Sequence, residues 1–490
     1  MKVVVIGGGL GGLSAAVTLA KHGADVKLFE QNKHFGGKMM PVDQEGYHFD
    51  FGPNTITMPE VFEDVVRQGG LNPAEELPFI QIKNHTRNQF SDGSSIDFSS
   101  DPIYMKKQLA NMDSSGAAAY DQFSAEVERL FELSRQNFLY RSFSSWRDYL
   151  SPSLARNILK VRPLQSLDRF FKRYFTNPNI IQALNRYATY VGSSPYSVPA
   201  TFAMIAHLEL NQGVFYVKGG NTKIASSFVK AAENQGAQLF NETRITNIAI
   251  DGGKATGVTT SSGEYHEADY VVLNGDLLHA LPELVPETYR NKFSNEKAAS
   301  FDPSISAFVI LAGLNNRLEH LHHHHLFFTE DYFKEFESLK RGEYPDDPTI
   351  YIGTSAKTDP SVSPNGDNCL ILVNAPALKD DSSSDSSEYK EIIYEKLQQA
   401  SIPVKDHIQV EKVFTPATIR DKFGAYKGSL YGPSSNNKIQ AFARPFNRSQ
   451  DIENLYFCGG STHPGGGSPM VVISGQNVAN DILGILVDRK

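Results

Sequence analysis

The first fifty residues alternate between short apolar runs and turns in the order strand, helix, strand. Val3–Ile6 form a continuous apolar run, as expected of a parallel strand covered on both faces. Apolar residues at helical spacing follow from Leu13 to Ala20, and Gly23 ends that helix. Val26–Phe29 form a second strand. The pattern predicts a βαβ unit of a doubly wound α/β fold.

Three further blocks follow, and each has a different pattern. Residues 101–218 are mainly helical, residues 300–415 alternate apolar runs with polar turns as in an antiparallel sheet, and the stretches around them return to the α/β pattern. The elements expected there are a helix over 224–232, a strand over 238–240, a hairpin at 251–253, strands over 270–273, 306–311, 349–352, 369–373 and 455–458, and helices over 389–400 and 471–487.

The α/β pattern at the start, in the middle and at the end predicts one discontinuous domain with other material inserted. We assign residues 1–100, 219–300 and 445–490 to a Rossmann-like domain. Residues 101–218 would form a helical cap, and residues 301–444 a substrate domain built on a β-sheet.

Composition narrows the functional class. The 490 residues are 40% hydrophobic and 21% charged, an ordinary globular balance, and 47 basic against 55 acidic residues argue against a nucleic-acid binder. Cys369 and Cys458 lack paired spacing, which argues against a disulfide framework and fits a reducing compartment. We find neither a signal peptide nor an apolar run of about eighteen residues, and expect a cytoplasmic protein that contacts a membrane only peripherally.

A glycine fingerprint follows the first strand. Gly7, Gly9 and Gly12 occupy the three glycine positions of GxGxxG, which allows a tight turn, close approach to a pyrophosphate and close helix–strand packing. Glu30, at the end of the second strand, would accept hydrogen bonds from ribose hydroxyls and would repel a 2′-phosphate, which argues against NADP. This fingerprint alone does not separate FAD from NAD.

A second glycine motif lies downstream. Gly36-Gly37-Lys38 and then Phe49-Asp50-Phe51-Gly52-Pro53 follow the second strand, and they suit another close approach to a long dinucleotide. Taken alone, they would equally suit a surface turn followed by an ordinary strand.

Together, these motifs resemble one family over essentially the whole chain: the FAD-dependent carotenoid desaturases and oxidases related to bacterial phytoene desaturase, within the wider flavin amine-oxidase superfamily. The resemblance is carried by VVIGGGLGGLSAA, FEQNKHFGGKM, YHFDFGPNTITMP, FYVKGGNTKIASSF, DYVVLNGD, DPTIYIGTSAKTDPSVSPNGDN and NLYFCGGSTHPGGGSPMVVISGQ. The histidine–proline pair in the last motif is specific to the carotenoid branch, whereas amine oxidases generally have an acidic residue in place of Gly460.

The resemblance implies a set of FAD-binding residues in an FAD-binding domain. Four would hold the adenosine and pyrophosphate, four would line the path to the flavin ring, one would pair with adenine through its backbone, and five would lie beside the isoalloxazine. In that order they are Gly7, Gly9, Gly12 and Glu30; Gly37, Lys38, Gly52 and Pro53; Ile245; and Gly459, Gly460, Pro469, Met470 and Val471.

The resemblance also implies the activity, FAD-dependent oxidation of an acyclic carotenoid or polyisoprenoid chain. No catalytic triad, dyad or metal site is evident, which fits chemistry carried by a flavin. The glycine loop looks more like that of oxidases acting on the terminal methyl of C30 diapocarotenoids, because desaturases more often have alanine at its middle glycine. A desaturase, an amine or porphyrinogen oxidase, and a non-catalytic flavoprotein remain alternatives. His463 would either carry a proton or only shape the loop.

Two other features invite a functional interpretation. His320 and His322–His325 form a histidine-rich run, but neighbouring residues of a strand point to opposite faces, so we expect no metal site there. The segment 141–217 holds nine basic and three acidic residues with many aromatic ones, including Trp146. This composition predicts contact with an anionic membrane surface; the alternative is a helical cap with a solvated basic face.

Overall fold

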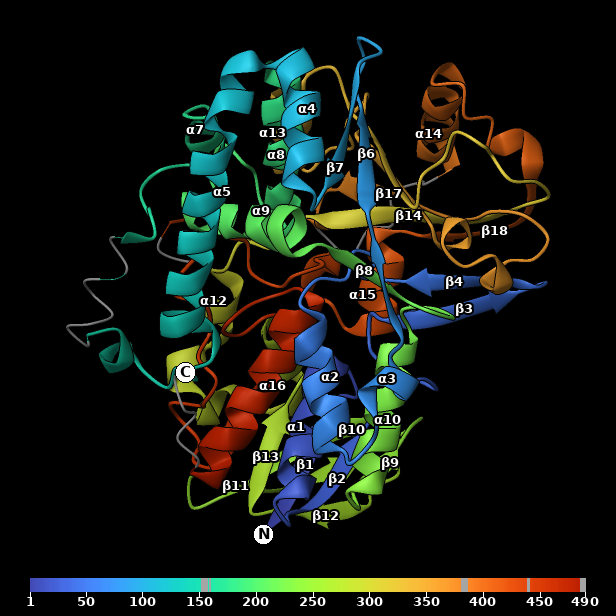
Figure 1. The fold of residues 1–490 in the computed structure, drawn as a ribbon. Coiled ribbons are helices and arrows are strands. Elements are labelled where there is room, and N and C mark those ends of the chain that lie inside the picture. Colours follow the sequence, from blue (N-terminus) through green and yellow to red (C-terminus); the bar gives the residue numbers. More distant parts are fainter. Residues whose placement is uncertain (151–156, 158–159, 380–386, 439–440, 485–490) are drawn as a thin grey trace.

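The computed structural model describes residues 1–150, 157, 160–379, 387–438 and 441–484. At its base lies a five-stranded parallel sheet in the order β19-β13-β1-β2-β9 (Figure 1). Its strands are β1 (Lys2–Ile6), β2 (Asp25–Phe29), β9 (Gln238–Phe240), β13 (Tyr270–Leu273) and β19 (Leu455–Phe457). Segments from the start, middle and end of the chain therefore meet in one sheet, which confirms the predicted discontinuous doubly wound fold.

Both faces of this sheet are covered, as the uninterrupted apolar runs predict. Val3 and Val5 of β1 pack against α1 (Leu10–Lys21), whereas Val4 and Ile6 pack on the opposite side. The elements on the first side are α1, α2 (Pro59–Gln68), α10 (Lys223–Asn234) and α16 (Ser468–Leu483); those on the second are β10 (Ile245–Asp251), β11 (Lys254–Thr260), β12 (Tyr265–Glu267) and α11 (Leu277–Leu284).

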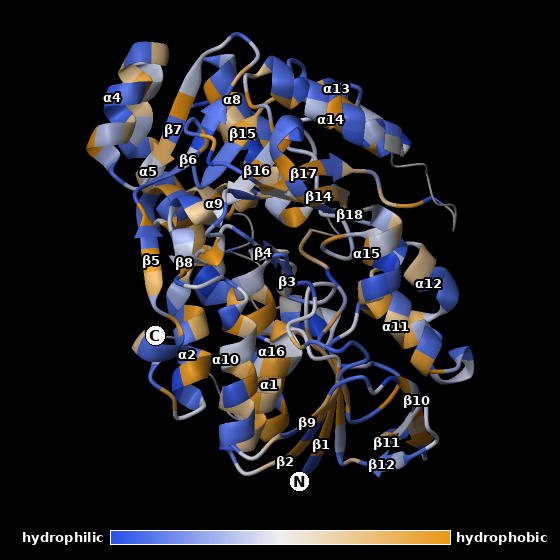
Figure 2. Ribbon diagram, turned by 90° about the vertical axis from the view of Figure 1, so that its right-hand side faces the viewer, coloured by the Kyte–Doolittle hydropathy of each residue, from blue (hydrophilic) through white to orange (hydrophobic). Residues whose placement is uncertain are grey.

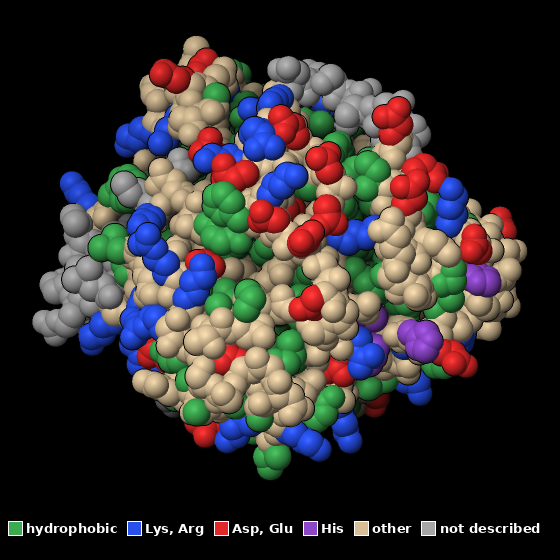
Figure 3. Space-filling model, turned by 90° about the horizontal axis from the view of Figure 1, so that it is seen from above, with side chains coloured by type: hydrophobic (Ala, Val, Ile, Leu, Met, Phe, Trp, Pro, Cys, Tyr) green, Lys and Arg blue, Asp and Glu red, His purple; other side chains and the backbone are tan. Residues whose placement is uncertain are grey.

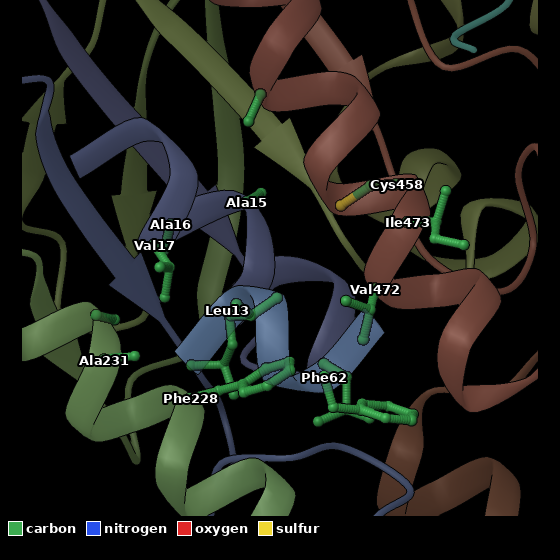
Figure 4. Close-up of a cluster of buried hydrophobic side chains, with 14 of the residues drawn as sticks. Leu13, Ala15, Ala16, Val17, Phe62, Phe228, Ala231, Cys458, Val472 and Ile473 are labelled. Carbon is green, nitrogen blue, oxygen red and sulfur yellow. The ribbon is translucent and has the colours of Figure 1, made fainter. Parts of the chain in front are cut away.

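Helix α1 lies at the centre of the first side. Figure 4 shows Leu13 of α1 beside Phe62 of α2 and Phe228 of α10, with Val472 of α16 nearby. A Cβ on Gly475 of α16 would lie 2.0 Å from the carbonyl oxygen of Gly11, so α1 and α16 touch backbone to backbone. Small residues therefore fix the first glycine loop against the C-terminal helix.

A second sheet of seven strands lies above the first, in the order β18-β14-β17-β16-β15-β6-β7 (Figure 2). It is antiparallel except where β15 pairs parallel with β6. The strands are β6 (Asn84–Gln89), β7 (Ser95–Ser99), β14 (Ser306–Leu314), β15 (His324–Phe327), β16 (Ile350–Thr354), β17 (Asn368–Ala375) and β18 (Ile408–Phe414). Because β6 and β7 belong to this sheet, the domain boundary that we placed after residue 100 does not coincide with the boundary between the sheets.

The two faces of the upper sheet differ in what covers them. Phe308 and Ile310 of β14 pack in a core shared with α14 (Ser387–Gln399), while the alternating residues Ala307 and Val309 point to the opposite side. This two-residue period gives β14 one face for its own core and one face toward the lower domain.

Residues 101–218 are mainly helical. The longest helices that the structure describes in this segment are α4 (Pro102–Met112), α5 (Ser114–Ser134) and α8 (Pro178–Asn185), joined by α7 (Leu167–Phe171), α9 (Met204–His207) and short 3₁₀ and π turns. Phe123, Phe171 and Tyr187 are fully buried in its core, which also receives side chains from α13 (Tyr332–Arg341). No helix in the described part of the chain is long and apolar enough to cross a membrane.

The remaining elements are short. The hairpin β3–β4 and the pair β5–β8 connect the layers, and the predicted hairpin at 251–253 joins β10 to β11. Helix α16 begins at Ser468, three residues before the predicted start, and the end expected at Val487 lies outside the described residues. The other bounds are β3 (Met40–Gln44), β4 (Tyr47–Phe51), β5 (Phe79–Ile82), β8 (Val214–Val217), α3 (Pro73–Glu76), α12 (Asn295–Ala299) and α15 (Pro416–Phe423).

Candidate functional site

A cavity of about 760 Å³ lies between the two sheets, at the carboxyl ends of β1, β2 and β13. This is where α/β sheets of this type place their ligands. The predicted residues that line it are Gly7, Gly9, Glu30, Gly37, Lys38, Gly52, Pro53, Ile245, Gly459, Gly460 and Val471. Gly12, Pro469 and Met470 do not line it.

The first glycine loop presents backbone to the cavity. Gly7 has a φ of +100°, and Gly9 caps α1 without any side-chain hydrogen bond, so the first N–H groups of the helix have no side-chain partner. Such a helix start favours a phosphate. Gly12 does not line the cavity, but it allows α1 to pack closely against the loop: a Cβ there would lie 2.1 Å from the Gly7 carbonyl oxygen.

Two further glycine loops abut the first. The Gly36 N–H donates to the Gly8 carbonyl oxygen at 2.8 Å, and a Cβ on Gly37 would lie 3.2 Å from the Gly9 Cα. A Cβ on Gly52 would lie 2.1 Å from the Lys38 carbonyl oxygen. The three loops form a cradle that side chains would fill, which is the geometry a long dinucleotide needs.

Glu30 is held in place at one end of this cradle. The Gly8 N–H donates to Oε2, and the backbone N–H and side-chain amide of Asn32 donate to Oε1, each at 2.8 Å. Two carboxylate oxygens accept about four hydrogen bonds, so acceptor capacity is left for a ribose hydroxyl.

We expect Glu30→Ala to weaken FAD binding by about 1–3 kcal/mol, because it removes charge-assisted hydrogen bonds and an anchor of the first loop. Glu30→Arg should be worse, since its bulk crowds the ribose. The affinity is measured by titrating apoprotein with FAD, with Glu319→Ala, an exposed glutamate, as the control. Unchanged affinity in both Glu30 variants would show that this carboxylate is wrongly assigned.

Lys38 carries a half-buried positive charge on the cavity wall. Its Nζ donates to the carbonyl oxygens of Ser429 (3.1 Å) and Leu430 (2.6 Å). Burial lowers the pKa of Lys38 to about 8, and the charge of Asp276 opposes this shift. Burial likewise raises the pKa of Asp276, which Lys38 opposes. Each group thus helps to keep the other charged.

The C-terminal glycine loop forms the opposite rim. Gly459 has a φ of +102°, and its N–H donates to Ser474 Oγ at 3.2 Å. Gly467 caps α16 without a side-chain hydrogen bond, so this helix also directs uncapped N–H groups to the cavity. In contrast, Pro469 is buried and Met470 packs into the α1–α16 core.

His463 does not line the cavity. Its ring is buried against Phe143 at 4.4 Å between ring centroids, and Nε2 hydrogen-bonds to the Phe138 carbonyl oxygen at 2.7 Å. Burial lowers the pKa of His463 to about 4. These contacts support the alternative in which His463 only shapes the loop, joining it to the cap.

Several residues that line the cavity are not among those predicted from the sequence. Asn274 donates from its side-chain amide to the Gly7 carbonyl oxygen (3.0 Å), and Asp276 caps α11. Both directly follow β13, so the rule on the carboxyl ends of parallel strands could have found them. Arg420 and Tyr431 come from the sheet domain, and no local pattern in the sequence marks them.

The histidine-rich run forms β15 and the residues before it. His323, His324 and His325 bond to three different partners, Thr358, Tyr351 and Gln89. Among the described residues, no three His, Cys, Asp or Glu side chains are grouped so that they could hold a metal ion.

The upper sheet supplies an apolar wall. Ala307 and Val309 of β14 and Leu370 and Leu372 of β17 line the cavity with the side-chain period of a strand. A ligand that spans the cavity therefore meets backbone N–H groups and charges on one side and hydrocarbon on the other.

Known proteins share this architecture. Residues 10–483 match the family described as flavin containing amine oxidoreductase. The 4,4′-diapolycopene oxygenase of Methylomonas sp is 33% identical, with 98% of each chain covered, and the 4,4′-diaponeurosporene oxygenase of Staphylococcus aureus (strain USA300) is 32% identical, covering 98% of this chain and 97% of that protein. Cyclohexylamine oxidase from Brevibacterium oxydans IH-35A, a solved structure, aligns at a TM-score of 0.62 with 16% identity, covering 99% of this chain and 98% of that one.

Proposed function

The chain belongs to the flavin containing amine oxidoreductase family and uses FAD, and from that premise we propose that it oxidises the terminal methyl group of an acyclic C30 polyene. Membership confirms the family resemblance and the flavoprotein fold. The observation that carries the proposed substrate is the near-full-length match to two diapocarotenoid oxygenases.

The cavity supports a hydrocarbon substrate. The four residues that β14 and β17 contribute are all apolar, so shape rather than charge would position the chain. Bound FAD would supply the two-electron acceptor for each oxidation step, and water would supply the oxygen atom of the alcohol. The protein would contribute the cradle of glycine loops and the N–H groups at the start of α16, which favour negative charge on the ring.

Three alternatives predict different behaviour. A desaturase would convert a saturated C30 or C40 chain without adding oxygen. An amine or porphyrinogen oxidase would reduce its flavin with a soluble primary amine or a porphyrinogen, and a non-catalytic flavoprotein would react with none of these. The non-acidic Gly460 argues against the amine reaction.

The test is expression in cells that accumulate acyclic C30 or C40 carotenoids, followed by chromatography and mass spectrometry of the pigments. We expect terminal alcohol or aldehyde derivatives of the C30 chain. New conjugated double bonds without added oxygen would establish the desaturase instead. Unchanged pigments, together with flavin reduction by a soluble amine, would establish the amine oxidase.

We further propose that the cap contacts an anionic membrane, from which such a substrate would enter. Trp146 is 57% and Leu164 72% exposed. The exposed basic residues among residues 141–217 are Arg147, Lys160, Arg169, Lys172 and Arg173. Lys and Arg side chains gather with hydrophobic ones at the left of Figure 3. Arg186 adds nothing to this surface, because it is buried with Glu209, and Arg156 lies outside the described residues.

We expect binding to liposomes that requires anionic lipid and weakens with salt, since each surface cation contributes about 1 kcal/mol and is screened over about 8–10 Å. The double variant Lys172→Glu, Arg173→Glu should float less well, whereas Lys21→Glu, Lys254→Glu, an equal charge change in the lower domain, should not. Flotation measures this directly. Equal binding to neutral and anionic liposomes at any salt concentration would mean that the basic face is only solvated.

A further inference from the structure

Arg444 carries a buried charge beside the C-terminal glycine loop. The residue is 6% exposed. Its Nη2 donates to the carbonyl oxygens of Tyr431 and Pro433, each at 2.9 Å, while its Nε has no hydrogen-bond partner. Among the described residues, Asp276 is the carboxylate whose charge acts on Arg444, and no ion pair joins the two. A buried cation without an ion-pair partner is costly, so this charge indicates an anion supplied from outside the chain.

The Arg444 side chain packs directly against the glycine loop. A Cβ on Gly465 would lie 3.2 Å from Arg444 Nε and 3.5 Å from its Cζ. The next two residues, Gly466 and Gly467, line the cavity, and so does Tyr431. Because consecutive Cα atoms are about 3.8 Å apart, Cζ lies within about 9 Å of the Gly466 Cα. Only the thickness of the loop separates the guanidinium from the cavity.

Two cations hold one segment of this cavity wall. Lys38 donates to the carbonyl oxygens of Ser429 and Leu430, and Arg444 donates to the two carbonyl oxygens that follow in the same segment. The charge of one carboxylate, Asp276, acts on both cations. Two cations and one carboxylate leave this part of the wall with a net charge of one positive.

Arg444 is protonated at neutral pH. Burial lowers the pKa of Arg444 to about 10, and the charge of Asp276 opposes this shift. His463 adds no charge here, because burial and the charge of Arg444 lower the pKa of His463 to about 4. Hydrogen bonding to two carbonyl oxygens alone would not require a charge, since the neutral amide of a glutamine also has two N–H donors.

The ring of bound FAD is the part that would lie nearest to Arg444. Glu30 lies at the ribose end of the cradle, and the loop that Arg444 contacts forms the opposite rim. A flavin ring that accepts a hydride gains one negative charge, so a fixed cation close by favours the reduced state.

We propose that Arg444 stabilises reduced FAD through its charge and thereby raises the reduction potential of the flavin. It acts across the glycine loop and does not line the cavity, so it is a positioning residue for charge and not a catalytic one. The inference rests on bound FAD and not on the C30 substrate.

The test is the reduction potential of the purified holoprotein, measured without substrate by equilibration with a redox dye. Arg444→Gln keeps two N–H donors and removes the charge. A unit charge that acts over about 9 Å at an effective dielectric constant of about 20 changes an equilibrium about 10-fold or more. At a given potential, Arg444→Gln should therefore lower the ratio of reduced to oxidised FAD about 10-fold, or about 30 mV for two electrons. Arg444→Lys, which keeps the charge, should remain close to the wild type.

Two further variants separate the charge from structural damage. Asp276→Asn removes the opposing negative charge but keeps a capping oxygen for α11, so it should raise the ratio when measured at pH 6.5, where Lys38 is protonated. Arg290→Gln is the matched control. This arginine is also buried and donates to two carbonyl oxygens, those of Val285 and Phe293, but its side chain lies at the start of α12. Its removal should leave the potential unchanged.

A wild-type potential in Arg444→Gln, or equal shifts in Arg444→Gln and Arg444→Lys, would mean that Arg444 only holds its two carbonyl oxygens, and the inference would fail. It would also fail if Asp276→Asn did not raise the ratio, and this variant decides the question if Arg444→Gln does not retain FAD. None of these results bears on the proposed function, because no carotenoid enters the measurement.

Discussion

Gly12→Val is expected to yield a protein without flavin. A Cβ at this position would lie 2.1 Å from the Gly7 carbonyl oxygen and 3.0 Å from the side-chain amide of Asn274. The closest atom is backbone, so no rotamer change relieves the clash. The first glycine loop must move away from α1, and the phosphate-binding N–H groups move with it. We expect FAD affinity to fall at least 100-fold, about 3 kcal/mol.

The control is the smaller substitution Gly23→Ala at the other end of the same helix. Gly23 has a φ of +82° but no atom within 4 Å of its Cβ position, so the cost is limited to backbone strain of about 1 kcal/mol. Its flavin content, read from the absorption spectrum of purified protein, should equal that of the wild type. Stoichiometric FAD in Gly12→Val would contradict the assigned packing role.

The N-terminal site was predictable because its determinants are local. Glycines between a buried strand and a helix have few uses, and the acidic residue ending the next strand comes from the same βαβ unit. The Gly7 and Glu30 positions follow from such short-range patterns, and the structure brings both to one cavity.

The other cavity residues are brought there by contacts between distant parts of the chain, and no local sequence pattern predicts those contacts. Tyr431 and Arg420 reach the cavity from the sheet domain, and their place is set by how that domain docks. In the C-terminal loop, the glycine pattern predicted which residues lie near the cavity, but not which of their side chains face it. Val471 lines the cavity, whereas its neighbour Met470 does not, because successive helical residues point about 100° apart.

The histidine-rich run was likewise only partly predictable from local pattern. A strand pattern predicted alternation, but it could not reveal that the run sits in the middle of a seven-stranded sheet. Burial lowers the pKa of His85 and His323 to about 4 and that of His325 to about 3. It also lowers the pKa of His324, and His463 behaves in the same way.

We therefore expect the protein to unfold at mildly acidic pH. These five histidines stay neutral when folded, but they gain protons below about pH 6.5 when unfolded. Stability is thus greatest above pH 6.5 and is lost as pH falls toward 4. Between pH 7 and 5, each of these histidines lowers the free energy of unfolding by about 2 kcal/mol, and the five together lower it by about 10 kcal/mol. The total free energy of unfolding of a protein is about 5–15 kcal/mol. Asp50 and Asp43 raise the pKa of His48 to about 9 against the effect of burial, and this opposes the loss by only about 1 kcal/mol.

Urea unfolding of the holoprotein at pH 7.5 and pH 5, followed by circular dichroism, measures this loss. His323→Asn retains a hydrogen-bonding group for Thr358 and removes one titrating group, so its stability should fall about 2 kcal/mol less over this range than that of the wild type. His320→Asn, at an exposed position of the same run, should follow the wild type. A fall of less than about 2 kcal/mol in the wild type would mean that these rings take up protons in the folded state, which requires water to reach the core of the upper sheet.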